Sequence, residues 1–255
     1  MVRTWRLTTR LLLVTILTVG VGLPTLVVAL ALPRRPRLRA RIGARATHLW
    51  ARLFLRAIGV RLTHTGPLPP PGVMVVANHL SYLDIPVLAA CIPTLFLSKA
   101  EIAHWPIIGY FARAAGTLFI DRDQTRDTGR VFGELSVWLR AGERITWFPE
   151  STTSPGATVA PFKPSLFQAA IRAGVPCHPA TLRPSVPGGG VDVSETVCWH
   201  GPAPLGGHAL RLLALRRVDY AVTFGDPILP NGDRKLLARR LHDAVAGAFV
   251  PVDRR

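Results

Sequence analysis

An uncharged run of 22 residues, positions 11–32, constrains this chain more than any other feature of its sequence. A helix of that length extends about 33 Å, which matches the roughly 30 Å hydrocarbon core of a bilayer. By the positive-inside rule, the denser arginine cluster after the run places the rest of the chain on the cytoplasmic side of the cytoplasmic membrane. The flanking arginines are Arg3, Arg6 and Arg10 before the run, and Arg34, Arg35, Arg37, Arg39, Arg41 and Arg45 after it.

Two other interpretations of this run are open at the level of sequence. Pro24 and the pair Gly20/Gly22 would allow a re-entrant or interfacial hairpin instead of a spanning helix. The tripeptide 29–31 (ALA) resembles a signal-peptide cleavage site. The six arginines that follow within residues 34–45 would hinder export, so the sequence favours a retained membrane helix.

The net charge of +16 is concentrated in the same region. Residues 1–83 contain twelve arginines and no acid, so the remainder of the chain carries only +4. Because these arginines surround an apolar run and not a nucleic-acid-binding motif, we expect membrane lipid as the partner and no nucleic acid. Three cysteines without a CxxC pair exclude a disulfide framework and a zinc finger, and no metal is expected.

Residues 44–58 have the pattern of a basic amphipathic helix. Arg45, Arg52 and Arg56 recur along one face, and Trp50 and Phe54 lie on the other. Such a helix can lie in the lipid headgroup layer, or it can dock on a globular domain with its arginines in solvent. The sequence leaves both interpretations open.

After residue 65 the chain alternates short apolar runs with helical patterns, which predicts an α/β fold. We expect a linker at 66–72, a loop or excursion at 184–216, and one domain over 66–255 with a central mostly parallel or mixed sheet flanked by helices. Residues 1–65 are assigned to membrane attachment. The expected strands are 73–77, 94–97, 117–120, 145–148, 175–182 and 218–224, and the expected helices are 85–91, 106–115, 125–141, 163–173 and 234–249.

Polar clusters follow three of these strands, where functional residues of α/β sheets gather. The first contains His79 and Asp84, which would lie on different faces of one regular helix. They can meet only if His79 precedes the helix, and Pro86 supports a helix start near Asp84 because proline is tolerated in a first turn. Asp84 would then orient one imidazole nitrogen and leave the other as a base.

Together these clusters resemble the motifs of the lysophospholipid acyltransferase family. NHLSYLD (78–84) resembles the family's NHxSxxD motif, and three further motifs follow in the family's order. The resemblance covers about residues 70–230 and implies transfer of a fatty acyl group from a thioester to a lysolipid hydroxyl. The further motifs are GTLFIDR (116–122), FPEST (148–152) and VPCHP (175–179).

The resemblance also implies roles for single residues. His79 would be the general base and Asp84 its orienting partner. Arg122 would bind the acceptor's phosphate. The other implied acceptor-binding or supporting residues are Asn78, Ser81, Glu150, Ser151 and Thr152. No cofactor is implied; acyl carrier protein or coenzyme A would bring the acyl group as the thioester co-substrate.

Two departures from the family pattern bear on the acceptor. Ser151 replaces the usual glycine and Thr153 the usual arginine of the third motif, which removes a phosphate-binding side chain. Residues 161–167 (PFKPSLF) resemble the version found in lyso-ornithine lipid acyltransferases. The first expected acceptor is 1-acyl-sn-glycerol-3-phosphate, giving phosphatidic acid, and the alternative is a lyso-ornithine lipid. A non-catalytic membrane-binding protein with a decayed domain is the third hypothesis.

Overall fold

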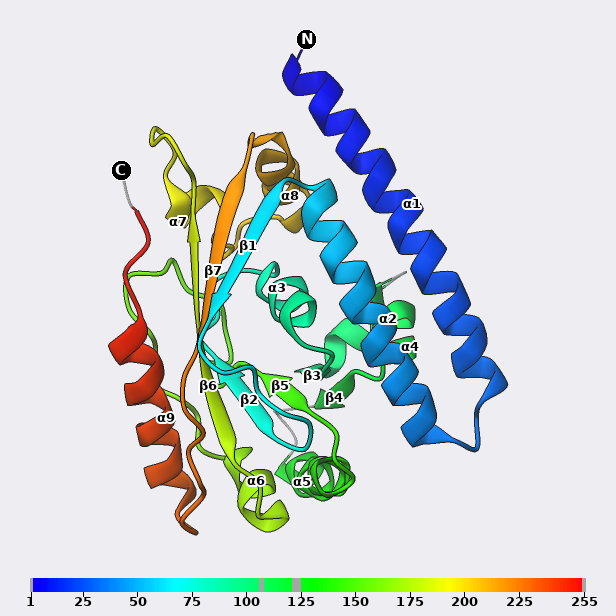
Figure 1. Ribbon diagram of the computed structural model, residues 1–255, viewed down its shortest axis with the longest axis vertical. Helices are drawn as coiled ribbons and strands as arrows, with labels where there is room; N and C mark the ends of the chain where they lie inside the picture. The colour runs from blue at the N-terminus through cyan, green and yellow to red at the C-terminus, as the bar shows by residue number, and fades with distance from the viewer. Residues whose placement is uncertain (1, 106–107, 121–124, 254–255) are drawn as a thin grey trace.

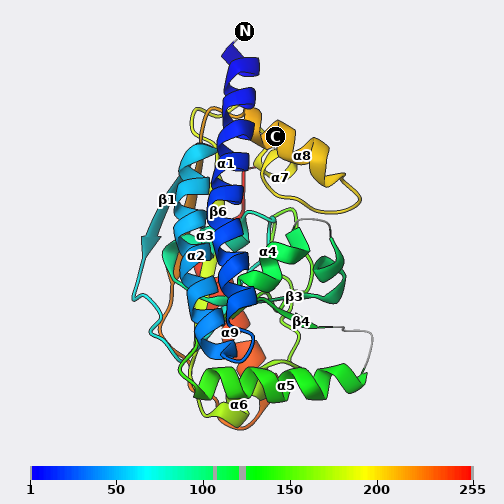
Figure 2. The same ribbon diagram turned by 90° about the vertical axis from the view of Figure 1, so that its right-hand side faces the viewer.

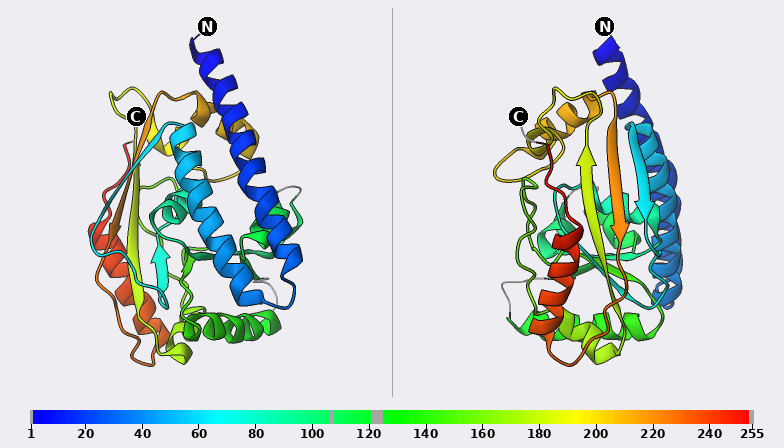
Figure 3. Two further views of the ribbon diagram at one scale, coloured as in Figure 1. Left: turned by 45° about the vertical axis from the view of Figure 1, so that its right-hand side comes forward. Right: turned by 60° about the vertical axis from the view of Figure 1, so that its left-hand side comes forward.

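The computed structural model describes residues 2–105, 108–120 and 125–253, and a seven-stranded sheet forms its centre (Figure 1). The strand order is β1-β7-β6-β2-β5-β3-β4, and the pairing is parallel except between β6 and β7 (Figure 3). This confirms the predicted mixed, mostly parallel sheet. The strands are β1 Val60–Thr65, β2 Met74–Ala77, β3 Leu95–Lys99, β4 Leu118–Ile120, β5 Ile145–Trp147, β6 Cys177–Ser185 and β7 Val218–Phe224.

Helices cover both faces of the sheet. One apolar core joins the sheet to α2, α3 and α8, and a second core joins its other face to α5, α6 and α9. Strand β2 lies between these cores and is buried along its whole length, which explains its continuous apolar sequence. The helices are α1 Val2–Ala31, α2 Pro36–Ala57, α3 Asp84–Cys91, η1 Ala100–His104, α4 Ile108–Ala114, α5 Thr125–Arg140, α6 Phe167–Ala173, α7 Val193–Thr196, α8 Leu205–Ala214 and α9 Arg234–Ala248.

Three elements differ from the sequence-based expectation. Strand β1 lies within the region assigned to membrane attachment, yet it pairs with β7 along its whole length. The loop or excursion predicted at 184–216 lies between β6 and β7 and contains two helices that the sequence did not predict, α7 and α8. The helix expected at 163–173 begins only at Phe167. Pro164 disfavours helical backbone at Lys163, and the bonds from Phe167 N to Pro164 O and from Gln168 N to Ser165 O form tighter turns before the helix.

Helix α2 docks on the domain and includes the amphipathic segment 44–58. Ala51 and Leu55 are buried in the core beside α3, and His48 Nδ1 lies 2.7 Å from the Ala89 carbonyl oxygen of α3. Trp50 stacks on Phe54 with ring centroids 4.7 Å apart. The docked interpretation of this segment is therefore the one that the structure supports.

Helix α1 runs beside α2 and also packs against α4 and α8 (Figure 2). It continues through Pro24 as one helix, so the residues suspected of forming a hairpin do not break it. Gly22 allows close approach to α4, since a β-carbon there would lie 2.3 Å from the Phe111 ring. Within the described part of the chain, α1 is the one helix long and apolar enough to cross a membrane.

Arg10 fixes the N-terminal part of α1 to the domain. Its guanidinium donates hydrogen bonds to the carbonyl oxygens of Leu213, Leu215 and Arg216 at 2.9, 2.5 and 3.0 Å. These carbonyls lie in the last turn of α8 or directly after it, where the helix dipole favours a cation. Only 8% of Arg10 is exposed, so this arginine is an internal clamp and not simply a charge flanking a membrane segment.

The opposite face of α1 is apolar and uncovered. Its exposed side chains recur at intervals of three, four or seven residues, which aligns them in one stripe along the helix. The stripe consists of Trp5, Leu12, Ile16, Val19, Leu23, Val27 and Leu30. An exposed apolar stripe of this length, on a helix followed by an arginine-rich segment, indicates association with a membrane.

Candidate active site

His79 and Asp84 meet at the carboxyl end of β2, as their spacing predicts. His79 lies in the loop after the strand, and Asp84 is the first residue of α3. The distance from His79 Nδ1 to Asp84 Oδ2 is 2.8 Å. The imidazole side chain is 17% exposed while the carboxylate is fully buried. This geometry assigns the Nδ1 proton to the bond with Asp84 and leaves Nε2 as the basic nitrogen.

Asp84 also organises the loop that carries His79. Its Oδ2 accepts hydrogen bonds from the backbone N–H groups of Leu80 and Ser81 at 2.6 and 2.9 Å. Its Oδ1 accepts a hydrogen bond from the hydroxyl of Tyr220, which projects from β7. A buried carboxylate with this many donors is held in one orientation, and it holds the loop in turn.

Tyr220 has no role in the sequence-based site. The alternation in VDYAVTF (218–224) does place its side chain on the buried face of the strand. Nothing local indicates the partner of its hydroxyl, because Asp84 lies 136 residues earlier in the chain. Only the sheet order, which brings β7 near α3, creates this contact.

Glu150 supports the catalytic loop from the opposite side. Its Oε1 accepts from the backbone N–H of His79 at 2.6 Å, and its Oε2 accepts from the N–H of Ala160 at 2.8 Å. Burial raises the pKa of Glu150, and these two N–H donors oppose that rise. Both carboxylate oxygens are therefore used in the architecture of the site; direct contact of Glu150 with an acceptor stays a prediction.

Asn78 and Ser81 are both fully buried and flank His79 in the loop. The Asn78 amide pairs with the backbone of Leu182 on β6, donating to its oxygen at 3.0 Å and accepting from its nitrogen at 2.7 Å. Asn78 thus continues the β2–β6 hydrogen bonding one residue beyond β2. The Ser81 hydroxyl has no partner among the described residues.

The plane of the His79 ring is set by stacking on Phe148. The two ring centroids are 4.0 Å apart and the planes differ by 9°. Stacking restricts rotation about the side-chain torsions, while Asp84 selects the tautomer. Phe148 immediately follows β5, so two adjacent strands supply the imidazole and its support.

The remaining predicted binding residues are less tightly grouped. Ser151 has a positive φ of 70°, which explains why the family pattern has glycine there. Its hydroxyl lies 3.5 Å from the Pro149 carbonyl oxygen. Thr152 is exposed beside it. Arg122 lies outside the described residues.

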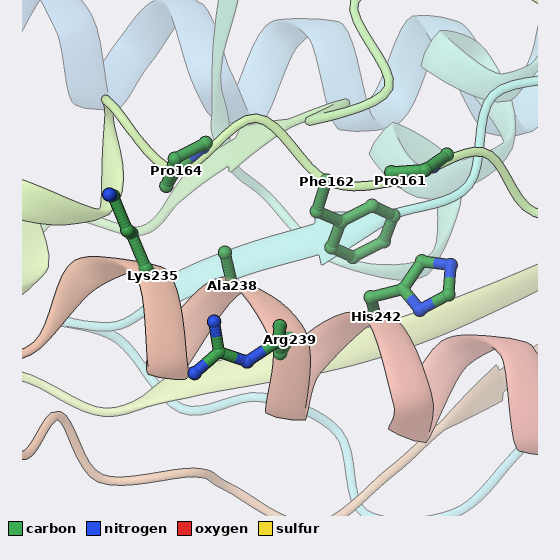
Figure 4. Close-up of a pocket in the computed structure, with 7 residues that line it drawn as sticks. All are labelled: Pro161, Phe162, Pro164, Lys235, Ala238, Arg239 and His242. Carbon is green, nitrogen blue, oxygen red and sulfur yellow. The ribbon is translucent and has the colours of Figure 1, made fainter.

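A separate basic pocket lies between α9 and the segment after Glu150 (Figure 4). Its volume is about 280 Å³, and neither His79 nor Asp84 lines it. His242 Nε2 lies 3.2 Å from the Val159 carbonyl oxygen, next to the residue whose N–H binds Glu150. The lining residues are Pro161, Phe162, Pro164, Lys235, Ala238, Arg239 and His242.

Known acyltransferases resemble this chain in sequence. Residues 59–183 match the family described as Acyltransferase. The chain is 35% identical over 205 residues to the lyso-ornithine lipid O-acyltransferase of Pseudomonas aeruginosa, covering 79% of this chain and 77% of that protein. It is 40% identical over 126 residues to the 1-acyl-sn-glycerol-3-phosphate acyltransferase of Neisseria gonorrhoeae, and this match spans only about half (49%) of each chain.

A solved structure shares the fold. The chain superposes on the 1-acyl-sn-glycerophosphate acyltransferase PlsC of Thermotoga maritima with a TM-score of 0.69, covering 97% of this chain and 95% of that one at 19% identity. This structural coverage extends to most of the N-terminal region, whereas the family match begins at residue 59, after α1 and α2. With the extended match to the Pseudomonas protein, these similarities establish that the chain belongs to the acyltransferase family whose members include lysophosphatidate and lyso-ornithine lipid acyltransferases.

Proposed function

We propose that this protein transfers a fatty acyl group from a thioester to the hydroxyl of a lysolipid. The observation that carries the proposal is the 2.8 Å bond between His79 Nδ1 and the buried Asp84, which leaves Nε2 as a base. The named relatives act on lysolipids, which supports an acceptor of that class.

The proposed reaction has two proton transfers. Nε2 of His79 removes the hydroxyl proton as the lysolipid oxygen attacks the thioester carbonyl carbon. Asp84 stabilises the imidazolium that forms. The tetrahedral intermediate then breaks its C–S bond, and the leaving sulfur takes the proton from the imidazolium, giving an ester and a free thiol.

An acyl group carried on Cys91 or Cys177 does not fit the structure. Burial raises the pKa of Cys91 and of Cys177 to about 12. A protonated thiol is a poor nucleophile, so direct attack by the lysolipid is the favoured route.

For the acceptor we propose a phosphate-free lysolipid of the lyso-ornithine type. The lyso-ornithine lipid relatives match over most of their length, and Thr153 replaces an arginine suited to phosphate. Lysophosphatidate is the second candidate, favoured by the 40% identity to the Neisseria protein and by Arg122 in the second motif.

We further propose that α1 lies along the cytoplasmic face of the membrane instead of crossing it. Arg10 is buried against the domain, and α1 remains beside α2, α4 and α8 along its length. A spanning orientation would require Arg10 to leave its three carbonyl acceptors. With α1 in the plane of the membrane, its apolar stripe faces lipid and the arginines meet headgroups.

The acyl-transfer proposal is tested with purified full-length protein, both acceptors, and acyl carrier protein and coenzyme A thioesters. We expect product from the lyso-ornithine lipid, and at least a roughly 100-fold loss of rate in His79→Ala, as is typical for removal of a general base. His64→Ala, at an exposed position of β1, is the matched control. Turnover of lysophosphatidate alone would reverse the order of acceptors; full activity in His79→Ala would overturn the mechanism.

The orientation of α1 is tested with single cysteines introduced at Thr4 and Arg37, which are exposed near the two ends of the apolar run. A membrane-impermeant maleimide should label both positions from the cytoplasmic side of inverted vesicles. Labelling of Arg37→Cys alone would contradict the in-plane orientation, since a spanning helix places its two ends on opposite sides.

A further inference from the structure

Tyr220 is the buried side chain closest to the catalytic pair that no motif of the family resemblance includes. It lies on β7 with no exposed surface, on the face of the sheet that packs against α3. Its hydroxyl donates to Asp84 Oδ1, the oxygen that does not contact His79. The phenol and the imidazole therefore act on the two oxygens of one carboxylate.

The donors around Asp84 are divided unequally between those oxygens. Oδ2 receives hydrogen bonds from His79, Leu80 and Ser81, whereas the bond to Oδ1 comes from Tyr220. All four bonds are to one carboxylate that has no exposed surface, where such bonds are strong. The Tyr220 bond fixes the carboxylate plane, so that Oδ2 stays directed at Nδ1.

The same bond withdraws negative charge from the carboxylate. Burial and the nearby charge of Asp84 raise the pKa of Tyr220 well above its ordinary value, so the phenol keeps its proton and remains a donor. A carboxylate that shares its charge with the phenol stabilises an imidazolium less than a free carboxylate would. The Tyr220 hydroxyl is thus placed to act, through Asp84, on how strongly an imidazolium at His79 is stabilised.

We propose that Tyr220 is a positioning residue that acts through Asp84 to set the pH range in which His79 works as a base. This inference rests on the proposed acyl transfer. The other titratable groups near the pair are Glu150, which binds the His79 backbone, and Cys198, which lies near Tyr220. Removal of the phenol hydroxyl leaves both of them in place.

The test compares pH profiles of kcat/KM for the full-length protein and Tyr220→Phe, which keeps the ring and removes the hydroxyl. We expect the acid limb of the profile to move to higher pH by about half a unit to one unit. The shift is this small because only part of the energy of the lost Tyr220–Asp84 hydrogen bond is transmitted to His79. KM for both substrates should stay within about twofold, because Tyr220 contacts neither reactant. Fluorotyrosine at position 220, a stronger donor, should move the limb to lower pH.

Tyr82→Phe is the matched control. Tyr82 is a partly buried tyrosine in the same region, but its hydroxyl lies 3.1 Å from His208 Nδ1 and does not contact Asp84. The acid limb of the kcat/KM profile of Tyr82→Phe should coincide with that of the unsubstituted protein. If Tyr220→Phe lowers the rate equally at every pH, the residue is merely structural and the proposal is overturned.

A second readout does not depend on turnover. The chemical shifts of the His79 imidazole, followed by NMR as the pH changes, should have their midpoint displaced in Tyr220→Phe and not in Tyr82→Phe. An unmoved midpoint would refute the role of Tyr220 even in a protein that turns over no acceptor. A displaced midpoint together with an active His79→Ala variant would instead refute the proposed acyl-transfer mechanism.

Discussion

Replacing Arg10 by methionine tests whether the first helix is an integral part of the domain. The substitution keeps an unbranched side chain but removes three hydrogen bonds, to Leu213, Leu215 and Arg216. Each bond to a charged donor contributes about 1.5–3 kcal/mol. The cost of burying and ordering a guanidinium offsets part of that sum. We expect the free energy of unfolding to fall by about 3 kcal/mol.

That loss converts to a measurable change in melting temperature. For a chain near this size, 1 kcal/mol corresponds to roughly 2–4 °C, so Arg10→Met should melt about 6–12 °C lower than the unsubstituted protein. The assay is intrinsic tryptophan fluorescence during heating in detergent, and the chain contains six tryptophans. Packing around the guanidinium supports the estimate, because a β-carbon at Gly59 would lie 2.0 Å from Arg10 Nη2.

Arg6→Met is the matched control for the loss of an arginine from the same helix. Arg6 makes one long hydrogen bond, 3.3 Å from Nη1 to the Ala214 carbonyl oxygen, in a part-buried position. Its replacement should cost less than about 1 kcal/mol. Equal melting temperatures for Arg10→Met and Arg6→Met would refute the assignment of Arg10 as a buried clamp.

Two further stability measurements follow from the site. Ser151→Gly should raise the melting temperature by roughly 1–4 °C, because glycine adopts the observed φ of 70° without strain. The greater freedom of glycine in the unfolded chain offsets part of that gain. A lower melting temperature would contradict the prediction. Burial lowers the pKa of His208, so the unfolded chain takes up a proton near the ordinary value of 6.5 before the folded protein does. The free energy of unfolding should therefore fall as the pH drops below about 6.5, and His208→Gln should make that fall smaller. The measurement is the melting temperature of both proteins at pH 7.5 and at pH 5.5. An equal decrease in the two proteins would contradict the prediction.

The strands at the centre of the sheet were predictable from their amino-acid composition. Strand β2 and the other central strands are short apolar runs, because their side chains are buried in the core. Strand β1 was missed because VRLTHT (60–65) has few apolar residues, and its position beside β7 at the sheet edge demands little burial. Helix α8 was missed because two glycines in its first turn and the surrounding prolines hide an amphipathic pattern.

The contact between His79 and Asp84 was predictable because both residues lie within six consecutive positions. The loop and the helix start that bring His79 to Asp84 follow from spacing and from Pro86. The supports of the pair come from distant parts of the chain: Tyr220 from β7, and Ala160 through Glu150. Such contacts depend on the order of the strands in the sheet, and the pattern of residues along one sequence does not predict that order.

The charge of the N-terminal region has more than one role in the structure. The sequence analysis assigned all twelve early arginines to membrane attachment. Arg10 instead neutralises the end of α8 from inside the fold, and Arg41 pairs with Glu143 at 2.5 Å, which ties α2 to the turn before β5. Both arginines attach the two N-terminal helices to the rest of the domain. In the proposed in-plane orientation the apolar stripe of α1 faces lipid, so that orientation holds the His79 loop at a fixed position relative to the membrane surface.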